Sequence, residues 1–182
     1  MSYPAPGLQG LLVLLVIAAA IFDLRQRRIP NWLAASGFLA GIAMNLFLFE
    51  TPGLWISLKG AGIALLVYVP LFALRAMGAG DAKLMAAIGA ITGWQNWLAI
   101  MILTSLFGGV LAAIMVLGKG RVGQTLGNLT VILTSWRLGQ LPYQMTPELD
   151  VGSEKALRLP HAVSIFLGTM AFLAAAAFWA PR

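Results

Sequence analysis

Six mostly apolar stretches follow one another along the chain, and short groups of proline, glycine or charged residues separate them. The stretches run approximately from residue 7 to 22, 32 to 49, 54 to 74, 82 to 91, 97 to 117 and 160 to 180. Turn-forming residues fall between them, namely Ile29-Pro30-Asn31, Thr51-Pro52-Gly53, Gly78-Ala79-Gly80 and Gly93. A helix of about 20 apolar residues crosses a bilayer. The pattern therefore predicts an all-α polytopic membrane protein with about six transmembrane helices.

The fourth stretch is too short to cross the full thickness of a membrane. From Ala82 to the turn at Gly93 it would rise only about 18 Å, whereas the hydrocarbon core is roughly 30 Å thick. We therefore expect Asp81, which directly precedes this stretch, to begin below the membrane surface. Irregular backbone at that depth requires contact with protein or a water-filled cavity. The loop Gly78-Ala79-Gly80 is expected to be closely packed and open toward water, because glycine permits backbone angles and close approaches that other residues do not.

The segment from residue 118 to 159 contains too many polar residues to cross the bilayer. Within it Leu126, Leu129, Leu133 and Trp136 recur at near-helical spacing. This spacing predicts an amphipathic helix that lies in the membrane interface. A loose loop, in which the spacing arises by chance, is the alternative.

The composition excludes an ordinary soluble domain. The 182 residues are 60% hydrophobic and 10% charged, and the mean hydropathy is +0.87, whereas a soluble domain has about 25% charged residues. Length and composition together predict one integral membrane domain over residues 1–182. The chain has no cysteine and one histidine, which excludes disulfides, thiolate metal sites and histidine-rich metal clusters. We expect no metal ion.

The twelve Lys and Arg residues predict the orientation, because short loops rich in these residues stay on the cytoplasmic side of a membrane. If the loop over residues 23–31 lies inside, ten of the twelve fall on the inner side. The exceptions are Arg182 at the end of the chain and Lys59, whose long side chain can reach the outer interface. Both termini are then extracytoplasmic. The net charge of +6 indicates membrane orientation in this context, and we expect no nucleic-acid partner.

Two of the six acidic residues, Asp23 and Asp81, lie in apolar context next to predicted crossings. An ionisable residue in such a place is a candidate functional group. The chain crosses outward and returns between them, so both are expected on the same side of the membrane. Two carboxylates that share a site split their titrations and the pKa of one is raised, so the pair can share a proton at the working pH. Such a pair can activate water for peptide hydrolysis while the shared proton polarises the scissile carbonyl. Asp23 and Asp81 are therefore the candidate catalytic pair.

Purely structural roles for the same residues stay open at this point. Asp23 alone could be a helix-terminal charge paired with Arg27 or Arg28, and Asp81 alone could be the N-cap of the helix that follows it. His161 stands at the start of the last apolar stretch, where capping or packing is the expected role.

Residues 23–31 (DLRQRRIPN) and 78–84 (GAGDAKL) resemble the two signature stretches of type IV prepilin leader peptidases. The second stretch contains the Gly-x-Gly-Asp motif, which is followed here by Lys83. Residues 159–163 (LPHAV) are also similar to the start of the final helix in this family. The resemblance extends over most of the chain, except for the long inner loop.

The resemblance implies an aspartic endopeptidase that needs neither metal nor cofactor. In such an enzyme Asp23 and Asp81 are the catalytic residues, and Gly78 and Gly80 belong to the active-site loop. The substrates are prepilins and pseudopilins, whose basic leader is removed at the cytoplasmic face of the bacterial inner membrane. The lipid bilayer and a pilus assembly or secretion machinery are further partners. Larger members of the family also carry a methyltransferase domain, and this chain resembles the short form without it, as in tight-adherence (Flp) pilus systems.

Two other functions compete with this interpretation. Presenilin-like intramembrane proteases also use Gly-x-Gly-Asp, but this chain has no Pro-Ala-Leu motif near its last apolar stretch and six rather than nine predicted crossings. A small proton- or cation-coupled transporter, or a pilus or secretion assembly subunit, could instead use buried aspartates as ion sites. A transporter needs Asp23 and Asp81 on a path that reaches both faces, whereas a peptidase needs them in a cavity open to the cytoplasm alone.

Overall fold

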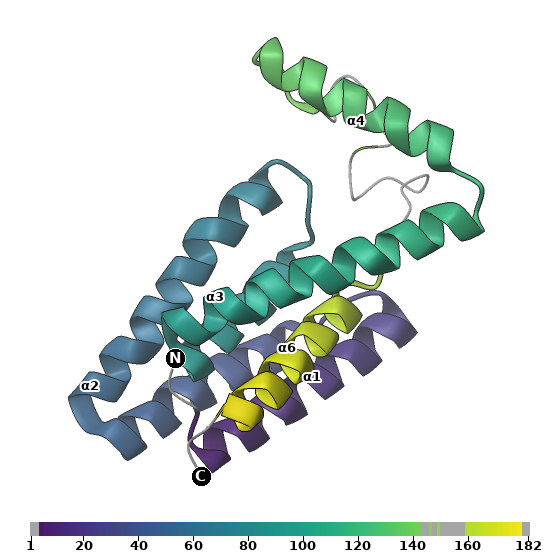
Figure 1. Ribbon diagram of the computed structural model, residues 1–182. Helices are drawn as coiled ribbons and strands as arrows, with labels where there is room; N and C mark the ends of the chain where they lie inside the picture. The colour runs from purple at the N-terminus through teal and green to yellow at the C-terminus, as the bar shows by residue number, and fades with distance from the viewer. Residues whose placement is uncertain (1–3, 143–145, 147–148, 150–158, 180–182) are drawn as a thin grey trace.

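The computed structural model describes residues 4–142, 146, 149 and 159–179, and no strand occurs within these ranges. Five α-helices make up most of the described chain (Figure 1). In chain order they are α1 (Pro6–Gln26), α2 (Asn31–Ala73), α3 (Ala79–Gly118), α4 (Val122–Arg137) and α6 (His161–Trp179). The all-α class that the apolar pattern predicts is confirmed for these residues.

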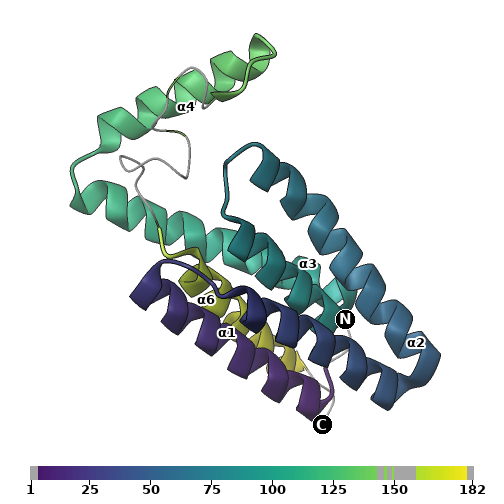
Figure 2. The same ribbon diagram turned by 180° about the vertical axis from the view of Figure 1, so that it is seen from behind.

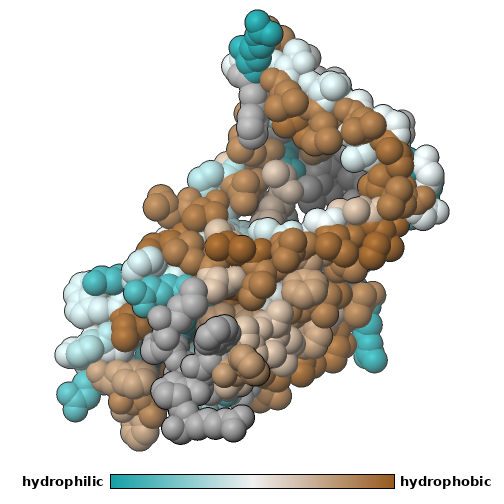
Figure 3. Space-filling model, in the orientation of Figure 1, coloured by the Kyte–Doolittle hydropathy of each residue, from teal (hydrophilic) through white to brown (hydrophobic). Residues whose placement is uncertain are grey.

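Four of the helices, α1, α2, α3 and α6, are long and apolar enough to cross a membrane. Large apolar side chains are exposed along them, and apolar residues cover most of the face shown in Figure 3. The most exposed of these side chains include Leu14, Phe47, Leu66 and Phe178. An apolar surface of this extent is unfavourable in water and matches the hydrocarbon of a bilayer.

One residue in α2 and one in α3 leave the helical conformation. Glu50 has φ 53° and ψ −142°, and Gly93 has φ 73° and ψ 166°. The chain turns back at both points (Figures 1 and 2). The positive φ at Gly93 favours glycine, and Pro52 falls in the first turn after Glu50, where its missing N–H leaves no hydrogen bond unmade. The helical stretches on either side of these residues match the predicted apolar stretches, although the first interruption precedes the predicted turn at Thr51 by one residue.

α4 forms where the sequence predicts an amphipathic helix, so the alternative of a loose loop is wrong for this part of the segment. It stands apart from the other helices in both views (Figures 1 and 2). Leu126, Leu129 and Leu133 of the predicted apolar stripe are exposed. The side chain of Trp136, the fourth member of that stripe, lies outside the described part of the structure. The location of α4 in a membrane interface stays a prediction.

Residues 79–92 of α3 form a helical stretch at the centre of the bundle, and the side chains from Leu84 to Gly93 are all buried. A helix that is almost entirely apolar is expected to be surrounded on every side. The rise of this stretch is about 21 Å, which is short of the roughly 30 Å of a hydrocarbon core. α2 crosses it at a very short distance, because a Cβ atom on either Gly60 or Gly89 would collide with the backbone of the other.

Asn45 and Ser57 of α2 bind the open end of this central stretch. Since the helical conformation stops at Gly93, the last carbonyl groups before it need partners outside the helix. Nδ2 of Asn45 donates to the carbonyl oxygens of Ala90 and Ile91, at 3.0 Å and 3.1 Å. Oγ of Ser57 donates to the carbonyl oxygen of Ala90 at 2.7 Å. A carbonyl without a partner is costly inside a membrane, so these bonds stabilise the packing of α2 on α3.

Replacing Asn45 with Leu, which has a similar size, is expected to destabilise the bundle. The change removes the side-chain donor to Ile91, and a buried acceptor left unsatisfied costs about 1–3 kcal/mol. The measurement is the midpoint of thermal unfolding in detergent, followed by circular dichroism. Asn128→Leu makes the same replacement in α4, away from the bundle, and serves as the control. Equal shifts in the two variants would contradict this role of Asn45.

Candidate active site

Asp23 lies in the last turn of α1, and not in the loop that the sequence predicts from residue 23 onward. α1 continues to Gln26 because Arg27, in the left-handed conformation (φ 51°), donates its backbone N–H to the carbonyl oxygen of Asp23 at 2.8 Å. Oδ2 of Asp23 accepts the backbone N–H of Ala162 at 3.0 Å. Ala162 lies in the first turn of α6, whose N–H groups have no partner within the helix. The Asp23 carboxylate therefore joins the end of α1 to the start of α6.

Asp81 is the third residue of α3, and the N-cap of this helix is Gly78. The interpretation of Asp81 as the N-cap is therefore wrong by three positions. Its carboxylate accepts a hydrogen bond from the backbone of Gly78, as the acidic side chain of a capping box does. This bond holds the carboxylate at the first turn of α3 and leaves it half-buried.

The structure brings Asp23 and Asp81 together at one end of the bundle, close enough for their charges to interact. The end of α1 and the first turns of α2, α3 and α6 form this end. α1 and α6 run antiparallel beside each other in both views (Figures 1 and 2). The sequence predicts the two residues on one side because two crossings separate them, and their positions at one end of the bundle agree with that prediction.

Two further side chains lie near the carboxylates. His161, the first residue of α6, interacts electrostatically with Asp23, and its Nε2 is buried without a hydrogen-bond partner in the described chain. Tyr68 of α2 is 3% exposed and interacts electrostatically with Asp81. The ring of Tyr68 packs edge-to-face on Trp97, with the ring centroids 6.0 Å apart.

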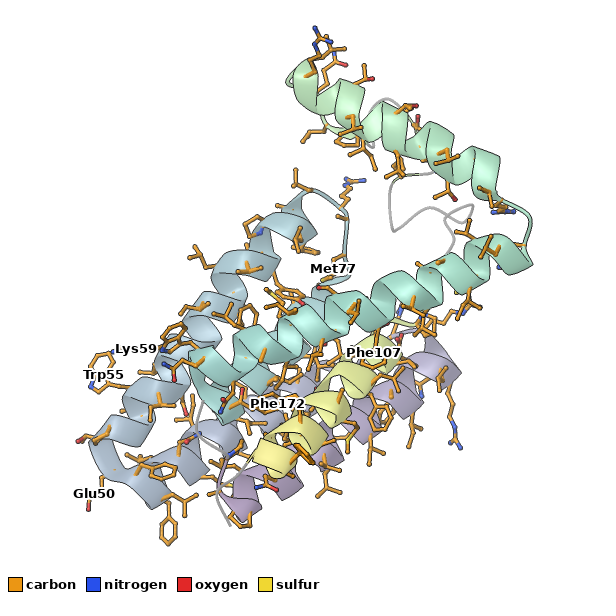
Figure 4. All side chains as sticks on the ribbon, in the orientation of Figure 1. Glu50, Trp55, Lys59, Met77, Phe107 and Phe172 are labelled. Atoms are coloured by element: carbon orange, nitrogen blue, oxygen red, sulfur yellow. The ribbon has the colours of Figure 1, made fainter. Side chains whose placement is uncertain are left out.

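Sequence reasoning missed two of the contributors to this site. Ala162 acts through its backbone N–H, so its residue type carries no signal. Tyr68 lies inside an apolar stretch without a motif around it. The start of α6 was detectable from Pro160 and His161, but nothing in the sequence pairs it with Asp23. In Figure 4 Met77 lies just before the start of α3, the helix that carries Asp81.

Gly78 and Gly80 do not adopt the backbone angles that only glycine permits, although the sequence suggests that reason for them first. The described glycines with positive φ are Gly93, Gly120 and Gly139. Gly78 is extended (φ −74°, ψ 147°) and lies outside the helix, whereas Ala79 and Gly80 are in the first turn of α3. The expected irregular loop is therefore wrong for residues 79–80. Both positions require glycine because neighbouring atoms leave little room for a side chain. A Cβ on Gly80 would lie 3.3 Å from the Cβ of Ile29, and a Cβ on Gly78 would lie 3.3 Å from Oδ2 of Asp81.

The chemistry that the described site offers is that of two neighbouring carboxylates. One can accept a proton from water while the other donates a proton to a carbonyl oxygen. Within the described ranges, no three His, Cys, Asp or Glu side chains are grouped as metal ligands.

The sequence profile of the type IV leader peptidase family matches residues 10–113, which is more than half of the chain. The matched region includes both Asp23 and Asp81. The chain is also similar to curated proteins described as prepilin leader peptidase/N-methyltransferase. That of Myxococcus xanthus is 32% identical over 119 residues, which are 62% of this chain and 35% of the relative.

Two other relatives with the same description give similar values. That of Xanthomonas campestris is 32% identical over 123 residues, covering 58% of this chain and 39% of the relative. That of Aeromonas hydrophila is 35% identical over 119 residues, covering 57% and 39%. The matched part thus spans only about two-fifths of the length of these relatives. No solved structure matches the chain.

Proposed function

The chain belongs to the type IV leader peptidase family, and from this premise we propose that it is a membrane aspartic endopeptidase with Asp23 and Asp81 as its catalytic pair. Its substrates are prepilins and pseudopilins of the Flp type, from which it removes the basic leader. One observation carries the proposal: two carboxylates far apart in sequence meet at one end of the bundle. Each is held by a backbone hydrogen bond, from Ala162 and from Gly78.

In the proposed reaction a water molecule between the carboxylates attacks the carbonyl carbon of the scissile peptide bond. The ionised carboxylate takes a proton from this water, and the protonated one gives its proton to the carbonyl oxygen. The C–N bond of the tetrahedral intermediate then breaks. As it breaks, the leaving nitrogen takes a proton from one carboxylate and the other regains a proton from the hydroxyl group. The fixed positions of Asp23 and Asp81 favour this chemistry, because catalytic groups held in place lose little entropy during the reaction.

We further propose six membrane crossings, one each for α1 and α6 and two each for α2 and α3. The interruptions at Glu50 and Gly93 support this arrangement, since the chain turns back at both. Arg25, Arg27 and Arg28 are exposed beside Asp23, which supports a site at the cytoplasmic face of the bacterial inner membrane. The exposed leucines of α4 support its location in the same interface.

This arrangement suits a substrate that is itself a membrane helix. The apolar helix of a prepilin lies in the bilayer beside the enzyme, while its Lys- and Arg-rich leader stays inside. The cleavage site between them then lies at the depth of Asp81, which is in the first turn of α3. Pilus assembly or secretion machinery acts on the product.

A transporter is less well supported than a peptidase. It needs a path from the aspartates to the opposite face, whereas the side chains from Leu84 to Gly93 beyond Asp81 are all buried in close packing. Presenilin-like proteolysis is less well supported because the family match is to leader peptidases.

Co-expression with a Flp-type prepilin, in a host without its own prepilin peptidase, tests the proposed function. Leader removal is scored by the shift of the pilin on a gel and by the mass of its new N-terminus. The purified protein, reconstituted in vesicles with the same prepilin, should give the same product. A substrate that stays intact in both experiments contradicts the proposal.

Gly80→Val is expected to reduce leader removal by about 10²-fold, since small displacements of a reacting group have effects of that size. The branched side chain cannot fit beside Ile29 without moving the turn of residues 29–31 away from the start of α3. Membrane insertion and abundance should stay close to wild type. Gly109→Val is the control, because a Cβ on Gly109 meets no atom within 4 Å. Full activity of the Gly80 variant would mean that the contact with Ile29 is unimportant.

A further inference from the structure

Lys83 and Asn31 form a direct bond between the two segments that carry the aspartates. Nζ of Lys83 donates to Oδ1 of Asn31 at 2.9 Å, although 52 positions separate the two residues in the sequence. Asn31 is the first residue of α2, at the end of the turn that follows α1. Lys83 follows Asp81 by two positions on α3, and both partners are exposed. The proposed reaction assigns no task to either.

Neighbouring contacts tie the same segments together. The turn before α2 lies against the start of α3, where a Cβ on Gly80 would lie 3.3 Å from the Cβ of Ile29. The turn is also joined to the end of α1, because Phe22 and Trp32 pack edge-to-face with centroids 5.9 Å apart. Phe22 precedes Asp23, and Trp32 follows Asn31. A continuous set of contacts therefore leads from Asp23 through α2 to Asp81.

We propose that Lys83 and Asn31 are positioning residues of the active site, and we call their bond the Asn31–Lys83 brace. The brace holds the start of α3 against the start of α2 and thereby sets the separation of the two carboxylates. This inference rests on the proposed function. Lys83 acts through Asn31 and not through its own charge at the site.

The position of Lys83 argues against a direct electrostatic role. Two residues beyond Asp81 on a helix, a side chain lies about 200° around the axis from it. The Lys83 ammonium is exposed and its hydrogen bond goes to a neutral amide. The observed hydrogen bond of Lys83 instead joins the start of α3 to the start of α2.

Such a brace matters because the carboxylates sit at helix ends joined by turns. A bond to a charged donor adds more than a neutral one. Without it, the end of α3 that carries Asp81 can move relative to α1 while the buried centre of the bundle stays intact. We expect the rate of the chemical step to fall and the apparent affinity for substrate to change little, because the proposed role of the brace is to set the separation of the carboxylates and not to bind substrate.

The test is a double-mutant cycle with the full-length protein in vesicles and a reconstituted prepilin. Lys83→Met and Asn31→Leu each remove one partner and keep its approximate size. We expect each to lower kcat by about tenfold, with KM within about twofold of wild type. The double variant should be no slower than the slower single variant, because both changes break the same bond. Lys119→Met, at the exposed C-cap of α3, is the control for loss of a lysine and should leave kcat unchanged.

Two conservative variants keep the test decisive if a single variant inserts poorly. Lys83→Arg and Asn31→Asp preserve a donor and an acceptor, and both should retain most of the wild-type kcat. The proposal is overturned if Asn31→Leu is fully active while Lys83→Met is slow, since Lys83 would then act by charge alone. The proposal is also overturned if the two substitutions lower kcat independently, so that their fold-changes multiply in the double variant. If wild type itself fails to cleave, the proposed function has failed and not the brace.

Discussion

Asp23→Asn and Asp81→Asn will each abolish leader removal from a co-expressed prepilin while the protein remains inserted and abundant. Asparagine keeps the size of aspartate but neither accepts a proton from water nor donates one to a carbonyl oxygen. Loss of a general acid or base costs up to about 10⁴-fold in rate, and here either change removes half of the pair. The amide oxygen of asparagine can still accept the backbone hydrogen bonds from Ala162 and Gly78, so the fold should be preserved.

The fraction of processed pilin on a gel, at matched enzyme abundance, measures the effect. Glu50→Gln provides the matched control, because Glu50 is an exposed carboxylate at the interruption of α2 and lies far from Met77 in Figure 4. It should process the pilin as wild type does. Normal cleavage by either aspartate variant would end the assignment of the catalytic pair.

Gly60→Val should have the largest effect on stability. A Cβ at this position would collide with the backbone of Gly89, and backbone cannot rotate out of the way as a side chain can. Forcing extra atoms into a packed core costs about 1–3 kcal/mol and sometimes more. We expect the upper end of that range here. The displaced α2 would also lose the hydrogen bonds of Asn45 and Ser57 to the end of the central stretch.

The measurements are the midpoint of thermal unfolding in detergent and the resistance of the protein to a soluble protease. Gly62→Val is the matched control, since it lies two positions away on α2 and a Cβ there meets no atom within 4 Å. The two variants share the cost of a branched residue in a helix. A similar loss of stability in both would show that the crossing of Gly60 and Gly89 is not the cause.

Much of this architecture could be predicted from local sequence signals. Apolar stretches bounded by Pro52 and Gly93 predict where α2 and α3 are interrupted, because proline and glycine act on the backbone at their own positions. The spacing of leucines predicts α4 in the same way. The shared location of Asp23 and Asp81 follows from counting crossings, which needs only the order of the stretches.

The features that sequence reasoning missed are contacts between residues remote in sequence. Ala162 supplies a backbone donor, and a backbone group leaves no trace in the identity of its residue. The need for glycine at position 80 comes from Ile29, which no local rule connects to it. The extension of α1 through Asp23 was missed because charged residues there suggest a loop, whereas Arg27 ends the helix one turn later.

The hydrogen bond between Asp23 and Ala162 joins α1 to α6, which are the first and the last of the described helices in chain order. During synthesis the first four helices leave the ribosome while Asp23 still lacks this partner. The hydrogen bond of Asp23 with Ala162 can therefore form only after α6 has entered the bilayer. A nascent chain stalled before that point carries both aspartates without this hydrogen bond, so the proposed site is complete only once α6 is in place.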